Sequence, residues 1–223
     1  ICRHRVAIWT DPKMTDDTRV TAVEIPGPAG PLEGLVNAKL EGSARAIAVL
    51  AHPLPTAGGT MHTKTVFHTA KALARIDCPV LRFNFRGVGR SAGTFSGGPG
   101  EQADFRAALQ FMIARYPDVR RVRAGGMSFG SWVAMTVGAE DPRVTTLIGI
   151  APPVNTYDWS AVVNAGKPCF IIHGEFDELI PVKEIRKFYG LLPEPRELVV
   201  IDGADHLFDG KVMEVGEAIE DLL

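Results

Sequence analysis

The sequence RVRAGGMSFG at residues 121–130, followed by SWVAMTVGAE at residues 131–140, predicts a strand, a sharp turn and a helix in that order. The strand is expected at Arg121–Met127 and the helix at Ser131–Glu140. The turn between them, Gly126-Met127-Ser128-Phe129-Gly130, fits the pattern G-x-S-x-G. In this context a strained turn lifts the serine hydroxyl clear of the sheet edge, and the glycines let the neighbouring backbone pack closely. The motif therefore predicts that Ser128 is a nucleophile rather than part of a plain glycine-rich turn.

Apolar, β-branched runs alternate with helix-period segments on both sides of this unit. Strands are expected at Val20–Ile25, Leu32–Leu40, Ala46–Ala51, Pro79–Phe85, Arg121–Met127, Val144–Ile150, Pro168–His173 and Glu197–Ile201. Their alternation with helices predicts a doubly wound α/β fold, a mostly parallel eight-stranded sheet with helices on both faces. The first two strands, joined only by the turn Pro26–Pro31, should pair antiparallel. Ala46–Ala51 is apolar on both pleat faces, as expected for an inner strand.

Three apolar stripes with spacings of three and four predict helices that pack on this sheet. The stripes consist of Val66, Ala70, Leu73 and Ala74; of Phe105, Ala108, Leu109, Met112, Ile113 and Tyr116; and of Phe208, Val212, Val215, Ile219 and Leu222. Clusters of Pro and Gly, among them Gly93–Gly100, predict turns. None of these clusters is long enough to link two domains.

Composition excludes several classes of protein. The 223 residues are 46% hydrophobic and 22% charged, which indicates one soluble globular domain. Lys and Arg number 24 against 26 Asp and Glu, with no basic run, so nucleic acid is not an expected partner. No apolar run approaches the roughly 20 residues that cross a bilayer. Three widely spaced cysteines argue against a disulfide framework and favour a cytoplasmic location.

The ends of the domain follow from the same patterns. Residues 1–19 are predicted to be an N-terminal extension, and residues 20–223 a single domain. The stretch Ile1–Trp9 lacks a continuous apolar region and does not resemble a signal peptide. Because the chain opens at Ile1 rather than Met, a preceding segment that was removed is compatible with the sequence.

A serine nucleophile needs a base to take its proton and a carboxylate to orient that base. His206 follows the last predicted strand, directly before the C-terminal helix, and is the expected base. His68 falls in a helix and His173 ends a strand, where a structural hydrogen bond is expected. His4 gives no argument in either direction.

The carboxylate should come from the loop that follows Pro168–His173. Asp177 lies in this loop and gives the chain order serine, aspartate, histidine, one of the three known orders of such triads. Glu175 and Glu178 in the same loop remain alternatives. Asp205 is a poorer candidate, because it is the direct neighbour of the histidine in sequence.

Acyl transfer also needs N–H donors for the developing oxyanion. One expected donor is the backbone N–H of Phe129, immediately after the nucleophile. The other should come from the loop after the third strand, His52-Pro53-Leu54-Pro55. Because proline has no N–H, Leu54 is the expected donor if this loop supplies one near its start.

Together these residues resemble the α/β-hydrolase superfamily over roughly Val20–Leu223. His52-Pro53 stands where many members have His-Gly, and Leu54 matches the oxyanion position that follows. The stretch His52–Ser91 is similar to small hydrolases related to dienelactone hydrolase, and its Asn84–Ser91 turn is usually structural in the superfamily. Dienelactone hydrolase itself has a cysteine nucleophile, so Ser128 favours ordinary esters as substrates.

The segment that forms a helical cap in many members of this superfamily is short in this chain. Many members insert a helical cap after the sixth strand, whereas here only Ala151–Lys167 separates the sixth and seventh predicted strands. A segment of this length forms a loop or one short helix, so an open site that favours short acyl chains is expected. Candidate substrate-binding residues around it are His52, Val154 and Trp159.

No cofactor or metal is expected. Gly87–Ala92 fits G-x-G-x-x-A, but no helix opens there to hold a pyrophosphate, and Gly59–Thr65 lacks the second glycine of a phosphate loop. The chain contains neither H-E-x-x-H nor paired C-x-x-C, so zinc is not expected.

Taken together, these residues predict a carboxylesterase-type serine hydrolase acting on a small ester. The same triad would serve a thioesterase or a small-amide hydrolase, and a non-catalytic binding protein of this fold is a further alternative. The oligomeric state is left open.

Overall fold

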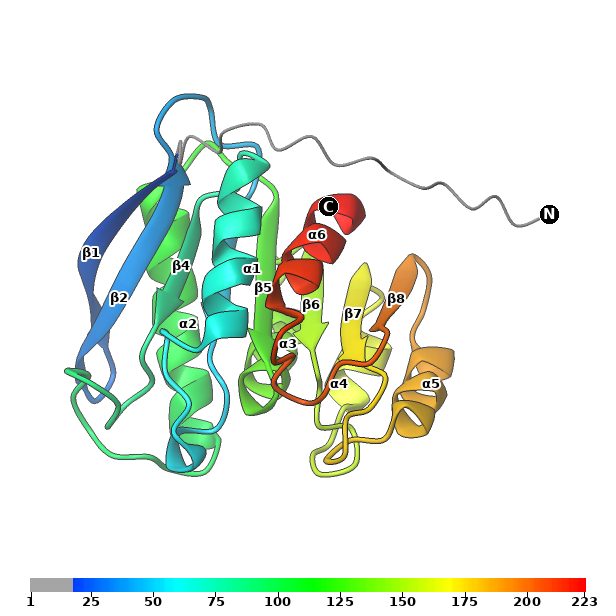
Figure 1. Cartoon of the computed structure of the whole chain (residues 1–223). Helices are drawn as coiled ribbons and strands as arrows, with labels where there is room; N and C mark the ends of the chain where they lie inside the picture. The colour runs from blue at the N-terminus through cyan, green and yellow to red at the C-terminus, as the bar shows by residue number, and fades with distance from the viewer. Residues whose placement is uncertain (1–17) are drawn as a thin grey trace.

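The computed structural model describes residues 18–223, and all eight predicted strands form one sheet in the order β1-β2-β4-β3-β5-β6-β7-β8 (Figure 1). The strands are β1 (Thr18–Gly27), β2 (Gly30–Lys39), β3 (Ile47–Ala51), β4 (Val80–Phe83), β5 (Val122–Met127), β6 (Thr146–Ile150), β7 (Cys169–Gly174) and β8 (Arg196–Ile201). Strand β2 pairs antiparallel with β1 and β4, and all other neighbours are parallel. Each strand begins and ends within two residues of its predicted bounds, and the eight-stranded, mostly parallel fold is confirmed.

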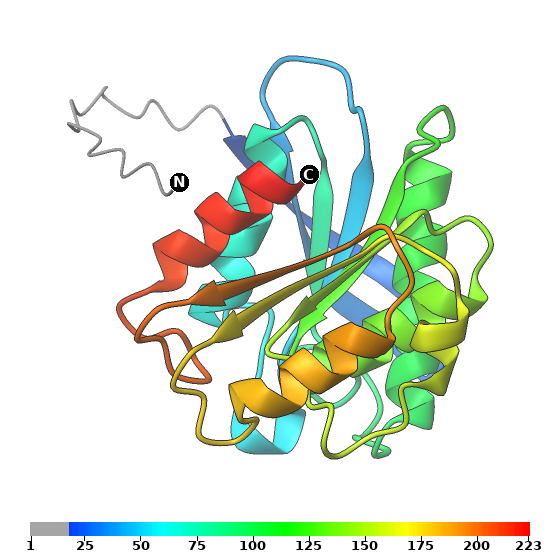
Figure 2. The same ribbon diagram turned by 90° about the vertical axis from the view of Figure 1, so that its right-hand side faces the viewer.

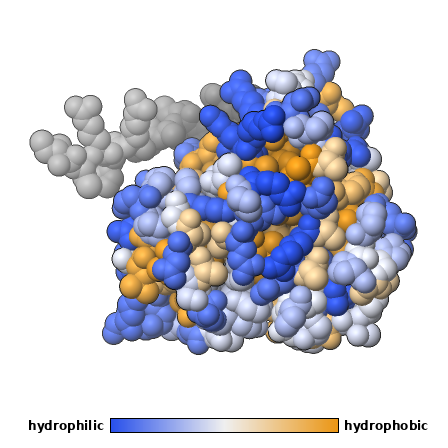
Figure 3. Space-filling view, turned by 180° about the vertical axis from the view of Figure 1, so that it is seen from behind, coloured by the Kyte–Doolittle hydropathy of each residue, from blue (hydrophilic) through white to orange (hydrophobic). Residues whose placement is uncertain are grey.

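Helices cover both faces of the sheet. They are α1 (Lys64–Arg75), α2 (Pro99–Arg115), α3 (Phe129–Glu140), α4 (Ser160–Asn164), α5 (Val182–Leu191) and α6 (Val212–Leu222), with a 3₁₀ turn η1 (Pro55–Ala57). Helices α1 and α6 pack side by side on one face, and α2, α3, α4 and α5 contribute to the core on the other (Figures 1 and 2). At the surface of the second face, hydrophobic residues are exposed in patches between hydrophilic ones (Figure 3).

The centre of the sheet is the most deeply buried part of the fold. All five residues of β3 are buried, and β3 lies between β4 and β5, as its apolar sequence predicts. The outer β1–β2 hairpin pairs Gly27 with Gly30 across a two-residue turn, shorter than the predicted Pro26–Pro31. Parallel strands β3 to β8 all end at the same edge, so the loops that follow β3, β5, β7 and β8 meet there.

Two helix ends differ from the prediction. Helix α2 begins at Pro99, inside the predicted Gly93–Gly100 turn, because proline suits the first helical position and the Glu101 carboxylate accepts the Gly98 N–H at 2.7 Å. Phe208 matches the apolar stripe of α6 but lies before that helix, with a φ of 60°. It is fully buried nonetheless, so its burial produced the helical pattern without helical structure.

The boundary of the predicted extension is also corrected. Thr18 and Arg19 belong to β1 and pair with Lys39 and Ala38 of β2. The rest of the predicted extension, residues 1–17, lies outside the described residues. Within residues 18–223, no helix is long and apolar enough to span a membrane.

Core packing against the second face should dominate stability. Phe105 of α2 is fully buried and its ring lies 6.2 Å from that of Phe83 in β4. We expect Phe105→Ala to lower the free energy of unfolding by about 3–5 kcal/mol, measured by urea denaturation. Arg106→Ala on the exposed side of the same helix removes only a surface ion pair with Glu140 and should cost about 1 kcal/mol or less. Equal losses in both variants would contradict this assignment of the core.

Candidate active site

Ser128 occupies the strained turn between β5 and α3. Its backbone has φ 52° and ψ −126°, a conformation that L-residues rarely adopt. The Ser128 N–H donates to the carbonyl of Ile150 at 2.8 Å, and the Ser131 hydroxyl donates to the Ser128 carbonyl at 2.6 Å. The turn is therefore tied to the end of β6 on one side and to the first turn of α3 on the other.

Two glycines allow the backbone to make this turn. A Cβ added at Gly126 would lie 2.5 Å from the Gly130 carbonyl, closer than carbon atoms approach. A Cβ at Gly130 would lie 2.3 Å from the carbonyl oxygen of His52 and 2.5 Å from that of Ala51. The first turn of α3 thus packs directly, backbone against backbone, on the carboxyl end of β3.

The structure brings Ser128, His206 and Asp177 into one hydrogen-bonded line. The Nε2 atom of His206 lies 3.0 Å from the Ser128 Oγ, and its Nδ1 lies 2.7 Å from the Asp177 Oδ2. Because a carboxylate only accepts, Nδ1 carries the proton and Nε2 is left to accept from the serine hydroxyl. The Asp177 side chain is fully buried and that of His206 is 12% exposed. This hydrogen-bonded geometry is the one that the predicted nucleophile, base and orienting acid require.

Asp177 is held as a carboxylate by several donors. Its Oδ1 accepts the backbone N–H groups of Leu179 and Ile180, both at 2.9 Å. Burial acts to raise the pKa of Asp177, but the opposing effects, led by the hydrogen bonds from His206 and Ile180, outweigh it and lower the pKa. The carboxyl group therefore stays ionised at neutral pH.

The rival carboxylates Glu175, Glu178 and Asp205 form no hydrogen bond with His206 among the described residues. Glu175 accepts the N–H of Gly203 at 2.9 Å, and Asp205 accepts the N–H groups of Leu207 and Asp209. Glu178 is exposed on the loop surface. Among these carboxylates, only Asp177 forms a hydrogen bond with His206. The loop that carries Asp177 was predictable from the sequence, but the choice within it depends on which side chain points inward.

The other histidines have structural surroundings. His173 is fully buried at the end of β7, and its Nε2 lies 2.8 Å from the carbonyl of Ile180, so the predicted structural hydrogen bond is present. His68 lies half-buried on α1, with its ring against that of Phe67. Neither ring forms a hydrogen bond with Ser128.

His52 does not fit the substrate-contacting position that was expected of it. The side chain is fully buried, its Nδ1 lies 2.7 Å from the carbonyl of Pro53, and its Nε2 accepts the Phe85 N–H at 3.1 Å. Burial lowers the pKa of His52 to about 4, although the bond to the Pro53 carbonyl acts in the opposite direction. The ring is therefore neutral and shapes the loop from within.

Leu54 and Phe129, whose N–H groups are the predicted oxyanion donors, lie on this loop and at the start of α3 respectively. Leu54 precedes the 3₁₀ turn η1, and its carbonyl accepts the N–H groups of Ala57 and Gly59. Phe129 is the first residue of α3, so its N–H has no acceptor within the helix. Because Gly130 packs on the carbonyl of His52, the loop that carries Leu54 lies against the start of α3.

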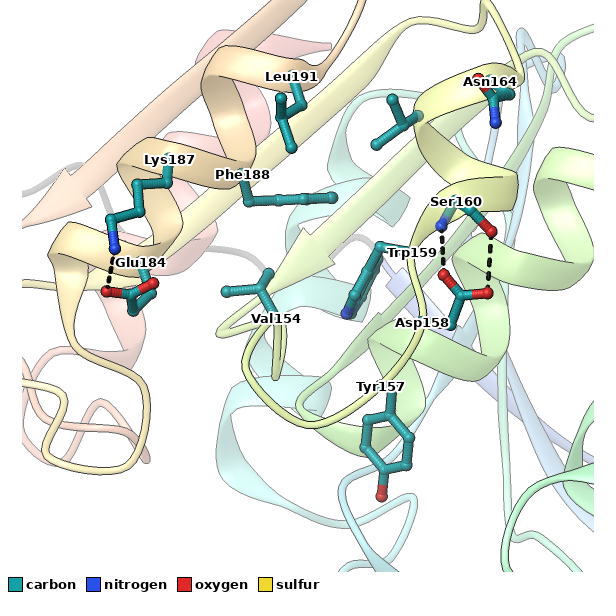
Figure 4. A pocket seen from close by; sticks show the side chains of 11 residues that line it. Val154, Tyr157, Asp158, Trp159, Ser160, Asn164, Glu184, Lys187, Phe188 and Leu191 are labelled. Carbon is teal, nitrogen blue, oxygen red and sulfur yellow. Dashed lines mark hydrogen bonds and ion pairs between the residues drawn. The ribbon is translucent and has the colours of Figure 1, made fainter.

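Val154 and Trp159 line a hollow of about 470 Å³ between α4 and α5 (Figure 4). Its walls are largely apolar: Trp159 and Phe188 meet edge to face at 5.1 Å, and Val154 lies between the two helices. The ion pair of Lys187 with Glu184 borders the hollow on the side of α5 (Figure 4).

Tyr157, which the sequence did not single out, lies between this hollow and the turn that carries Ser128. It lines the hollow, stacks on Trp132 at 4.2 Å, and its ring lies 6.0 Å from that of Phe129. A second hollow of about 260 Å³ adjoins the histidine itself and is lined by Glu178, Leu179, Asp205, His206 and Leu207. The sequence offered one signal for this second hollow: Leu179 lies two residues after Asp177, and Leu207 directly follows His206. Within residues 18–223, no group of three His, Cys, Asp or Glu side chains could hold a metal ion.

The close approach at Gly130 should make this position intolerant of any side chain. We expect Gly130→Ala to displace the backbone of β3 or of the turn and to lower the free energy of unfolding by about 1–3 kcal/mol or more, measured by urea denaturation. Gly190→Ala is the matched control, because no atom lies within 4 Å of a Cβ there. A Gly130→Ala protein as stable as the wild type would contradict the contact with His52.

His52 should make stability fall in mild acid. Because its pKa is lowered from 6.5 to about 4 by folding, the neutral ring stabilises the fold fully above pH 6.5, and this stabilisation is lost as the pH falls from 6.5 to 4. The shift corresponds to about 3 kcal/mol. The amide oxygen of a glutamine can still accept the Phe85 N–H but does not titrate. Between pH 6.5 and 4, we therefore expect the free energy of unfolding of His52→Gln, measured by urea denaturation, to fall by about 3 kcal/mol less than that of the wild type. Parallel curves for the two proteins would assign the acid sensitivity to other groups.

Comparisons with known proteins agree with this fold. A family model described as serine aminopeptidase, S33 (Hydrolase_4) matches residues 42–167, more than half of the chain, from the segment before β3 to the end of the loop after β6. Uncharacterized protein RP471 of Rickettsia prowazekii is 36% identical over an alignment of 205 residues, and the match covers 88% of this chain and 86% of that protein.

Two solved structures are similar over nearly their whole length. The α/β serine hydrolase XC6422 of Xanthomonas campestris, which has no lid, shares 32% identity with a TM-score of 0.83 and covers 95% of both chains. ATU1826 of Agrobacterium tumefaciens shares 35% identity with a TM-score of 0.83, covering 90% of this chain and 94% of that one. In this chain, the segment between β6 and β7 holds only a loop and the five-residue helix α4. The chain thus belongs to the Hydrolase_4 family and is an α/β-hydrolase without a cap.

Proposed function

We propose that this protein is a carboxylesterase-type serine hydrolase that cleaves short-chain carboxylic esters through an acyl-enzyme. The observation that carries the proposal is the line of hydrogen bonds from the Ser128 Oγ through His206 to the Asp177 carboxylate, at 3.0 and 2.7 Å. Such a line activates a hydroxyl that is otherwise a weak nucleophile. Membership of a hydrolase family supports the same reading.

Each side chain has one role in the proposed reaction. The Oγ of Ser128 forms a bond to the ester carbonyl carbon while the Nε2 of His206 takes its proton. The tetrahedral intermediate then collapses, the bond to the alcohol oxygen breaks, and His206 returns the proton to the leaving alcohol. Water repeats the sequence on the acyl-enzyme, with His206 as base, and releases the acid. Asp177 keeps the ring in the required tautomer and stabilises the imidazolium.

The N–H groups of Leu54 and Phe129 are the proposed oxyanion donors. Both are backbone groups held by packing: Phe129 opens α3, and the Leu54 loop is fixed by the His52 ring and by Gly130. Donors that are already oriented stabilise a developing charge without a cost of reorganisation, and one such donor typically contributes about 10²–10³ in rate.

The substrate class follows from the apolar surroundings and from the absence of a cap. We assign the acyl group or alcohol of a small ester to the hollow bordered by Val154 and Trp159, which Tyr157 joins to the nucleophile turn. Thioesters and small amides enter the same chemistry, and the family description names an aminopeptidase. The buried free thiols Cys78 and Cys169 support the cytoplasmic location proposed here.

Hydrolysis of p-nitrophenyl acetate, butyrate and octanoate tests the function. We expect turnover that is fastest with the shorter esters, and a loss of kcat of at least about 10³-fold in Ser128→Ala because the attacking oxygen is missing. A fluorophosphonate should label the wild type at Ser128 and leave Ser128→Ala unlabelled.

The matched control is Ser43→Ala, because Ser43 is an exposed serine in the loop before β3. It should retain full turnover and labelling. Equal rates in wild type and Ser128→Ala would contradict the nucleophile, and rates that rise steadily toward the octanoate would contradict the preference for short chains. An anilide series with the same acyl groups separates an esterase from an amide hydrolase.

A further inference from the structure

His173 is a fully buried histidine that the proposed reaction does not use. It is the next-to-last residue of β7 and lies four residues before Asp177 in the sequence. Its Nε2 is 2.8 Å from the carbonyl oxygen of Ile180 and 3.6 Å from the Oδ2 of Asp177. The imidazole therefore lies close to both ends of the turn Asp177–Ile180.

The surroundings of this ring fix its tautomer. A carbonyl oxygen only accepts hydrogen bonds, so the Nε2 that faces Ile180 carries the proton. The Nδ1 atom is buried and has no hydrogen-bond partner in the described part of the chain, as suits a nitrogen without a proton. Burial lowers the pKa of His173, against the opposing effects of the Ile180 carbonyl and the Asp177 charge. The ring is a neutral donor at neutral pH.

Ile180 is the link between this donor and the acid. Its N–H donates to the Asp177 Oδ1 at 2.9 Å, and its carbonyl accepts from His173 at 2.8 Å. The Ile180 side chain is buried, and the following Pro181 precedes α5. The peptide units around residue 180 are thereby held from both sides, and the turn that donates to Asp177 cannot rotate without breaking the bond to His173.

We propose that His173 is a positioning residue that, through the backbone of Ile180, holds the Asp177 carboxylate in line with the Nδ1 of His206. The proposal rests on the triad assignment made above. A displacement of about 1 Å in such a constellation costs up to about 10² in rate. Loss of an outer partner of a metal ligand typically costs about 10–100-fold in activity, and we expect an effect of the same order for this partner of the Asp177 turn.

A residue that only fills space would produce a different result from a positioning residue. When Asp177 moves away from His206, the imidazolium that forms during the reaction loses its stabilising partner. The acid limb of the pH profile of kcat/KM then moves to lower pH, and kcat falls while KM is retained. A pure loss of packing lowers the melting temperature and leaves the acid limb in place.

Two substitutions separate these cases. His173→Leu removes the donor but keeps the bulk, and we expect kcat for p-nitrophenyl acetate to fall about 10–100-fold, with the acid limb moved to lower pH. His173→Gln can place an amide N–H near the original Nε2 and should recover most of kcat and the wild-type limb. Ile171→Val, a buried residue on the same strand, is the packing control and should change neither.

The outcomes that overturn the proposal are specific. A folded His173→Leu protein with wild-type kcat and an unmoved acid limb contradicts a positioning role, and so does equal impairment of the Leu and Gln variants. If His173→Leu does not fold, His173→Asn takes its place, because its shorter amide cannot reach the Ile180 carbonyl.

A readout without turnover keeps this inference separate from the proposed function. The NMR resonance of the proton on the His206 Nδ1 should move upfield in the Leu or Asn variant, because its hydrogen bond to Asp177 weakens, whatever the substrate. A wild type that hydrolyses no ester would count against the proposed function alone. An unchanged Nδ1 proton resonance in a folded variant would count against the role of His173 alone.

Discussion

The close contact between the first turn of α3 and the end of β3 is the constraint on which the site depends. Gly130 lies so near the carbonyl of His52 that no side chain fits between them, and this contact holds Ser128 in its left-handed conformation. The same contact sets the loop of Leu54 beside the N–H of Phe129. One backbone-to-backbone approach therefore positions the proposed nucleophile and both proposed oxyanion donors together, and the strain at Ser128 is offset by packing around it.

The parallel register of the sheet then delivers the remaining groups. Strands β5, β7 and β8 end at one edge, where Gly174 pairs with Ile201. Asp177 lies three residues beyond the end of β7 and His206 five beyond the end of β8, so short loops bring both side chains to Ser128. Separation along the chain matters little here, because the sheet supplies the long-range order and each loop needs to place only one side chain.

The sequence predicted what local patterns encode and missed what depends on side-chain direction. Strand positions followed from apolar runs, and the G-x-S-x-G turn followed from its flanking strand and helix. His52 was expected to face substrate, but its ring turns inward to the N–H of Phe85, a contact between loops that no local pattern reveals. Phe208 shows the opposite error, since a buried aromatic residue at helical spacing lies outside the helix. The hollow between α4 and α5 was predicted only in part: Val154 and Trp159 were expected to border the site, whereas no local pattern indicated the wall that α5 supplies.

The lack of a cap determines how selectivity can arise in this fold. The loop between β6 and α4 is stiffened by Pro152 and Pro153, and the Asn155 side chain donates to the carbonyl of Leu179, so the loop is tied to the turn that holds Asp177. A segment fixed in this way leaves little freedom to close over a substrate. Discrimination must then come from side chains that already border the site, such as the exposed Leu179 and Leu207 beside His206. Because these residues lie close to the proposed acid and base in sequence, substitutions that change substrate preference act on the same two loops that hold the proposed triad in line.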